Sequence, residues 1–173
     1  MDTSYTSMKT VIISNRLPVK IIEENNEYTF IPSEGGLATG LGDVYKNGNS
    51  NWVGWPGIEV PEDRQQEVID KLAALNLYPV FLTQDEINLY YEGFSNEVLW
   101  PVFHYLVTYA HYEQSYWDCY KSVNQKFAQT TLKLLNKNDR IWIQDYQLLL
   151  LPCILRTQQP FATIGFFQHI PFP

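Results

Sequence analysis

Three residues with side chains suited to binding or proton transfer each follow a short apolar segment: Arg16, Asp145 and His169. The planar guanidinium of Arg16 matches the oxygens of a phosphate group, although a surface or ion-paired arginine fits the sequence equally well. Asp145 can accept hydrogen bonds from hydroxyl groups or balance a cation, but in isolation a loop or helix-capping role is favoured. His169 can donate to a hydroxyl group, yet a lone histidine beside Phe167 and Ile170 more often has a structural role.

A glycine pair and two aromatic residues join these candidates. Gly35 and Gly36 precede an expected helix, where glycine lets the backbone approach a diphosphate and the helix start offers free N–H groups. Such a pair alone more often marks a simple turn. Tyr91 and Trp100 flank a turn-like Phe-Ser-Asn segment, and aromatic faces line sugar-binding pockets as well as cores. Phe94, Phe103 and Phe127 are expected in the core. His104 is expected to have a packing role, and His111 is expected at the surface.

Apolar, β-branched runs alternate with helical patterns along the chain, which predicts an α/β fold. The expected strands are 10–14, 51–55, 77–82, 139–144 and 162–167, with an added hairpin at 20–24 and 28–32. The expected helices are 37–46, 61–76, 83–91, 113–136 and 148–158. This order predicts a Rossmann-like, doubly wound and mainly parallel sheet. Its carboxyl strand ends would bring Arg16, Asp145 and His169 to one crevice.

Composition and charge limit the classes of protein to which this chain can belong. A chain of 173 residues with 45% apolar content suits one globular domain with a hydrophobic core. The net charge of −7, without a run of Lys or Arg, disfavours nucleic acid and anionic membranes as partners. The sequence has no apolar leader or spanning run, which favours a soluble cytoplasmic protein. Cys119 and Cys153 lack metal-ligand spacing and are expected to be buried free thiols. No cofactor is expected.

The candidate residues also lie in segments with a specific order. These are ISNRLP (13–18), GGL (35–37), WVGWPG (52–57), YY (90–91), FSN (94–96), LWP (99–101), FHY (103–105), DY (145–146), GFF (165–167) and HIPFP (169–173). The series spans nearly the whole chain and resembles the trehalose-6-phosphate synthases, which form glycosyltransferase family 20. The resemblance outweighs the simpler interpretations of the glycine pair, Asp145 and His169.

The resemblance implies the amino-terminal half of a retaining GT-B enzyme. Such an enzyme transfers glucose from a nucleoside diphosphate glucose, expected to be UDP-glucose, to glucose 6-phosphate in trehalose biosynthesis, with no metal requirement. The resemblance implies that Arg16 contacts the acceptor phosphate and that Tyr91 and Asp145 bind the acceptor. It places Gly35 and Gly36 beside the donor diphosphate. It also implies roles in anomer selectivity for Trp100 and His169, and in catalysis for His169 and Asp145.

The chain departs from the family pattern at three glutamines. Where His-Asp-Tyr-His is usual, it has Gln144-Asp145-Tyr146-Gln147, so neutral amides replace two imidazoles. Gln168 stands where an apolar residue is common.

The end of the chain at Pro173, directly after the last expected strand, predicts a truncated acceptor-side domain spanning 1–173 without its nucleotide-binding partner. Such a fragment is expected to be inactive alone and prone to form a homo-oligomer through its exposed cleft. Two alternatives stay open. One is a glucosylglycerol-phosphate synthase, which Tyr91 and Trp100 disfavour because they suit a hexose acceptor. The other is a non-catalytic sugar-phosphate sensor.

Overall fold

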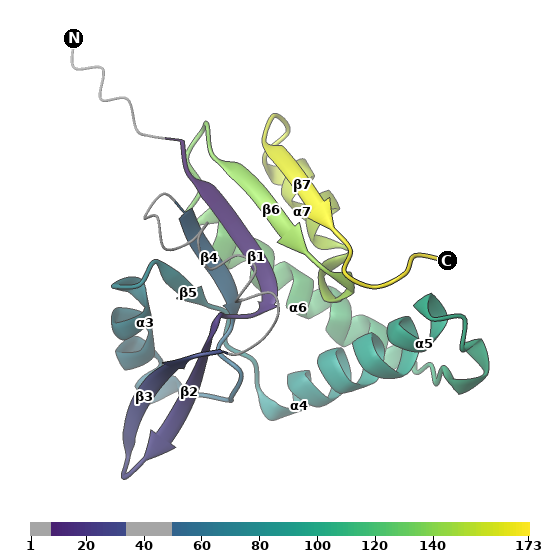
Figure 1. Cartoon of the computed structure of the whole chain (residues 1–173), viewed down its shortest axis with the longest axis horizontal. Helices are drawn as coiled ribbons and strands as arrows, with labels where there is room; N and C mark the ends of the chain where they lie inside the picture. The colour runs from purple at the N-terminus through teal and green to yellow at the C-terminus, as the bar shows by residue number, and fades with distance from the viewer. Residues whose placement is uncertain (1–7, 34–49) are drawn as a thin grey trace.

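The computed structural model describes residues 8–33 and 50–173, and a five-stranded parallel sheet forms its centre (Figure 1). The strands lie in the order β5-β4-β1-β6-β7, and each neighbouring pair is parallel. Their bounds are β1 Thr10–Arg16, β4 Ser50–Trp55, β5 Leu77–Pro79, β6 Arg140–Gln144 and β7 Thr163–Phe167. The predicted Rossmann-like parallel α/β sheet is therefore confirmed.

The sheet grows outward from β1 in both directions. From β1 the chain passes through β4 to β5 at one edge, and it then returns to the other side of β1 to form β6 and β7. Val11 shows the central place of β1, because it pairs with Asn51 of β4 and with Ile141 of β6. In sheets of this order, ligands bind in the crevice where the direction reverses. Here that crevice lies at the carboxyl ends of β1 and β6.

Helices connect the strands and cover the sheet (Figure 1). The longer ones are α3 (Gln65–Ala73), α6 (Gln114–Leu132), α7 (Leu151–Gln158) and a continuous helical segment made of α4 (Gln84–Glu86), the π-helix η2 (Ile87–Leu99) and α5 (Trp100–Phe103). Short 3₁₀ turns are η1 (Glu62–Arg64), η3 (Val107–Tyr109) and η4 (Tyr146–Leu148).

Alternate residues of β1 face two separate cores. Val11 and Ile13 pack into the core that η2, α6 and α7 cover, while Ile12 faces the core that contains Leu72 of α3. All three β1 side chains are fully buried. Burial on both faces explains why the strand is a continuous apolar run rather than an alternating one.

The appended hairpin has the predicted form, with strands β2 (Val19–Glu24) and β3 (Glu27–Pro32). Asn25 and Asn26 occupy its turn with φ values of 51° and 65°, a conformation that asparagine tolerates in two-residue hairpin loops. Arg64 fixes the hairpin to the body of the protein. Its guanidinium lies 3.8 Å from the centre of the Tyr28 ring and pairs with Glu23 at 2.6 Å.

The helix predicted at 83–91 continues to Phe103, so the prediction of a turn at Phe94 was wrong. The capping box at its start is present, with Thr83 and Glu86 each accepting from the other's backbone N–H. The continuation is π-helical: the Trp100 N–H donates five residues back, to the Ser95 carbonyl. The buried Ser95 hydroxyl donates to the Tyr90 carbonyl over 2.8 Å and satisfies it.

One predicted strand is shorter than expected, and one predicted helix lies outside the described residues. The strand expected at 77–82 ends at Pro79, after which the single bond from the Val80 N–H to the Gly54 carbonyl continues the contact with β4. The helix expected at 37–46 lies outside the described residues.

The cysteines are free, but only one is even half-buried. Burial raises the pKa of the Cys119 thiol to about 11, so this thiol is protonated at neutral pH. Cys153 is exposed, contrary to prediction, because Leu151 and Leu155 form the buried face of α7 and Cys153 lies on the opposite face. Among the described residues, no helix is long and apolar enough to cross a membrane.

Candidate functional site

A cavity of about 310 Å³ lies where β1 and β6 end, at the predicted crevice. It is called the crevice cavity below. Three residues singled out in the sequence, Arg16, Tyr91 and Asp145, line it together. The other lining residues are Ser14, Asn15, Leu17, Pro18, Ser33, Trp52, Gln144 and Gln147.

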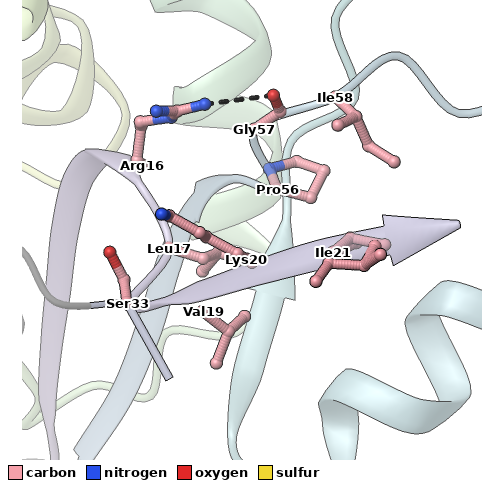
Figure 2. Close-up of a pocket in the computed structure, with 10 residues that line it drawn as sticks. Arg16, Leu17, Val19, Lys20, Ile21, Ser33, Pro56, Gly57 and Ile58 are labelled. Carbon is pink, nitrogen blue, oxygen red and sulfur yellow. Dashed lines mark hydrogen bonds between the residues drawn. The ribbon is translucent and has the colours of Figure 1, made fainter. Parts of the chain in front are cut away.

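Arg16 is the last residue of β1, and its side chain lies beside the loop after β4. Its Nη2 donates to the Gly57 carbonyl over 3.1 Å, as Figure 2 shows, and its guanidinium lies 4.8 Å from the centre of the Trp55 ring. Within the described part of the chain it forms no ion pair. A guanidinium has five N–H donors, so Arg16 keeps donors for an anionic ligand.

Gly57 makes this position of Arg16 possible. Its φ of +94° is a conformation that residues with side chains rarely adopt, and an added Cβ would lie 2.9 Å from Arg16 Nη2. Arg16 also borders a second cavity of about 200 Å³, which it shares with Lys20, Ser33 and Ile58 (Figure 2). Arg16 therefore stands between two hollows of the surface.

The floor of the crevice cavity is a set of buried hydrogen bonds. Trp52 Nε1 donates to Ser14 Oγ over 2.7 Å, and Ser14 Oγ donates to the Arg16 carbonyl over 2.6 Å. Burial raises the pKa of Tyr90 well above its ordinary value, so its hydroxyl stays protonated and donates to Asn15 Oδ1 over 3.0 Å. These bonds fix the end of β1 to β4 and η2.

Tyr91 follows Tyr90 in the π-helix and lies at the cavity. Its ring centre is 6.0 Å from that of Trp55, so the two rings form a tilted aromatic pair near the Arg16 guanidinium. An aromatic face beside a cation is suited to a ligand that is partly apolar and partly charged.

Asp145 has a strained backbone, with φ 73° and ψ 169°, a region that is nearly exclusive to glycine. Its N–H donates to the Phe167 carbonyl over 2.8 Å. Its Oδ1 accepts from the backbone N–H groups of Tyr146 and His169 over 3.0 and 3.2 Å. Oδ2 makes no hydrogen bond within the described residues.

The turn after Asp145 is held against the π-helix. Burial, helped by the Asp145 charge, raises the pKa of Tyr146, and its hydroxyl donates to Asn96 Oδ1 over 3.1 Å. The Tyr120 hydroxyl of α6 donates to the Tyr146 carbonyl over 2.8 Å and accepts from the Leu149 N–H over 3.0 Å. The strained turn is therefore tied to two helices.

His169 and Trp100 are not among the residues that line the crevice cavity. His169 is joined to it through Gln144, whose Oε1 lies 2.9 Å from His169 Nε2, and through its backbone bond to Asp145. Trp100 lies in α5, 40% exposed, with its ring stacked at 4.0 Å on His104. This stacking agrees with the packing role expected for His104. Gly35 and Gly36 lie outside the described residues.

Gln144 and Gln147 were noted from the sequence only as departures from the family pattern, and Ser33 was not singled out. Both glutamines line the crevice cavity and are buried, with exposed fractions of 1% and 8%. Gln144 Nε2 and Gln147 Oε1 have no hydrogen-bond partner within the described residues. The sequence signal that could have identified Gln144 and Gln147 as lining residues is their position on either side of Asp145-Tyr146. Nothing in the sequence around Ser33 marked it.

The fold and the cavity define a class of protein. A parallel α/β sheet with a cation, a carboxylate and aromatic rings at its switch point is a Rossmann-like domain, a class in which ligands generally bind at that point. Within this class, the chain matches the model of Glycosyltransferase family 20 over residues 8–173. The chain belongs to that family.

Individual relatives agree with this assignment. The chain is 42% identical over 171 residues to an alpha,alpha-trehalose-phosphate synthase [UDP-forming] of Candida albicans, covering 95% of this chain and 36% of the relative. A Burkholderia xenovorans alpha,alpha-trehalose-phosphate synthase (UDP-forming), solved in complex with glucose-6-phosphate, superposes with a TM-score of 0.72 at 32% identity, covering 95% of this chain and 34% of that one. An E. coli structure bound with UDP-2-fluoro glucose superposes with a TM-score of 0.74 at 34% identity, and it covers 95% of this chain and 34% of that one. The chain thus spans about a third of the length of these relatives.

Proposed function

We propose that the chain is the acceptor-binding part of an alpha,alpha-trehalose-phosphate synthase (UDP-forming), and that glucose 6-phosphate binds in the crevice cavity. One observation carries the proposal: Arg16, Tyr91 and Asp145 come from distant segments and line the same cavity. The complex of the Burkholderia xenovorans relative with glucose-6-phosphate supports the choice of ligand.

Each of these residues suits one part of that ligand. The phosphate would take the free N–H donors of Arg16, since a guanidinium pairs well with phosphate oxygens. A sugar hydroxyl would donate to Asp145 Oδ2, which has no partner within the described residues. Tyr91 would contribute an aromatic face beside Trp55.

The donor would be UDP-glucose, by analogy with the relative bound to UDP-2-fluoro glucose. Gly35 and Gly36 would lie by its diphosphate, and Trp100 and His169 would shape anomer selectivity. The protein's contribution would be orientation of the two substrates and stabilisation of charge in an oxocarbenium-like state, with retention at the anomeric carbon. Because the relatives are almost three times as long, we expect these 173 residues alone to bind the acceptor without turnover. The cytoplasm is the proposed compartment.

The proposal is tested by titrating the chain with glucose 6-phosphate while following tryptophan fluorescence. Trp52 lines the crevice cavity and Trp55 lies by Arg16, so binding should give a saturable change. Arg16→Ala should weaken the affinity about 10- to 100-fold, because a hydrogen bond to a charged group contributes roughly 1.5–3 kcal/mol.

Lys137→Ala is the matched control. It removes the same unit charge from an exposed position just before β6, at the opposite end of the sheet from Arg16, and should leave the affinity unchanged. Tighter binding of glycerol 3-phosphate than of glucose 6-phosphate would instead favour a glucosylglycerol-phosphate synthase. No response to either ligand would contradict the proposed acceptor site.

A further inference from the structure

Gln144 is the last residue of β6, and its side chain connects the buried end of that strand to the residue that follows β7 by two positions. β6 and β7 are parallel neighbours (Figure 1), and Gln144 is paired with Phe167 in their register. The Gln144 side chain is 1% exposed, and its Oε1 lies 2.9 Å from Nε2 of the exposed His169 ring. This contact joins a buried amide to a residue at the protein surface.

The chemistry of the two groups decides which of them donates. An amide oxygen has lone pairs and no hydrogen, so it only accepts. The ring nitrogen that faces it must therefore carry the hydrogen. We propose that Gln144 is a positioning residue that fixes His169 as the Nε2–H tautomer and leaves Nδ1 as the ring nitrogen available to a ligand.

Other contacts hold the ring in this orientation. The His169 backbone N–H donates to Asp145 Oδ1 over 3.2 Å, so neighbouring residues of the chain hold both the backbone and the ring of His169. The Phe167 ring meets the imidazole edge to face, with centres 4.6 Å apart. The ring therefore has a hydrogen bond at one nitrogen, an aromatic neighbour, and an anchored backbone.

The consequence for binding is specific. In the neutral ring Nδ1 is an acceptor, so it would accept a hydrogen bond from a ligand hydroxyl rather than donate one. This consequence rests on the proposed function, because it assigns the hydroxyl to a sugar substrate. The tautomer itself does not depend on any ligand.

The chain contains its own contrast. His104 Nδ1 lies 2.7 Å from the Trp100 carbonyl, which also only accepts, so His104 must carry its hydrogen on Nδ1. His111 is exposed, with Nε2 at 3.2 Å from a Glu113 carboxylate oxygen. The chain has three histidines in all, so each ring can be followed separately.

The test is a long-range ¹H–¹⁵N correlation spectrum of the ¹⁵N-labelled chain without ligand, at a pH well above the ordinary imidazole pKa of about 6.5. His169 should show a protonated Nε2 and an unprotonated Nδ1, and His104 should show the reverse. In Gln144→Leu, which keeps the bulk but removes the acceptor, His169 should become a mixture of both tautomers. Gln144→Glu, which restores an oxygen acceptor, should restore the Nε2–H form.

Unchanged His104 and His111 signals in each variant would show that the fold is intact. An Nδ1–H form of His169 in the unmodified chain would overturn the proposal, as would a single Nε2–H form that persists in Gln144→Leu. A failure of glucose 6-phosphate to bind would contradict the proposed function and leave this result untouched, because the spectra need no ligand.

Discussion

At the residue scale, Asp145 combines a strained backbone with the hydrogen bonds that hold it there. Its φ and ψ lie in a region that costs on the order of 1–3 kcal/mol for a residue with a side chain. Three close bonds, through its own N–H and its Oδ1, offset this cost. Asp145, which lines the crevice cavity, therefore keeps a conformation that costs stability.

Comparing Asp145→Gly with Asp145→Ala isolates the strain, because both variants lose the same carboxylate bonds. The glycine variant should have a higher free energy of unfolding than the alanine variant by about 1–3 kcal/mol, measured by urea denaturation. At an unstrained position alanine is the more stable of the two, by roughly 0.5–1 kcal/mol within a helix or strand. An alanine variant that is more stable than the glycine variant would show that Asp145 is not strained.

At the element scale, the π-helix η2 brings residues to the site from one segment. Tyr90 bonds to Asn15, Tyr91 lines the crevice cavity, and Asn96 accepts from Tyr146. Gly93 lets this helix approach α6 closely, since a Cβ there would lie 2.8 Å from the Tyr116 ring. The geometry of the site therefore depends on the packing of η2 against α6.

Gly93→Ala should lower the free energy of unfolding by about 1–3 kcal/mol, because the new methyl group overpacks this contact. Glu92→Ala, at the neighbouring exposed position, should change stability by less than about 0.5 kcal/mol. In a double-mutant cycle, Tyr116→Ala should remove most of the cost of Gly93→Ala. An equal cost of Gly93→Ala in both backgrounds would contradict the role of this contact.

At the scale of the whole molecule, the sheet could be predicted because its strands are short segments rich in β-branched, aromatic or other apolar residues and lie between turn residues. The crevice followed from it, since parallel strand ends of this order meet at one edge. Details that depend on contacts between distant residues could not be predicted. The Phe94-Ser95-Asn96 sequence is typical of a turn, but in the structure it is helical, and the Ser95 hydroxyl donates to the Tyr90 carbonyl.

The positive φ of Asp145 and the contact between Gln144 and His169 could not be predicted from the sequence either. Both depend on the pairing of β6 with β7, which the local sequence does not encode. Burial of Cys153 was wrongly predicted because cysteine is generally buried, whereas its place on α7 is decided by Leu151 and Leu155.

The central claim is that glucose 6-phosphate binds where β1 and β6 end, and chemical-shift mapping of the ¹⁵N-labelled chain tests it most directly. Titration should move the backbone signals of Arg16, Tyr91 and Asp145 and the indole signal of Trp52, all at the crevice cavity. Signals at the opposite end of β6, from Asn136 to Arg140, should stay in place. Shifts confined to that opposite end, or no shifts at saturating ligand, would contradict the account.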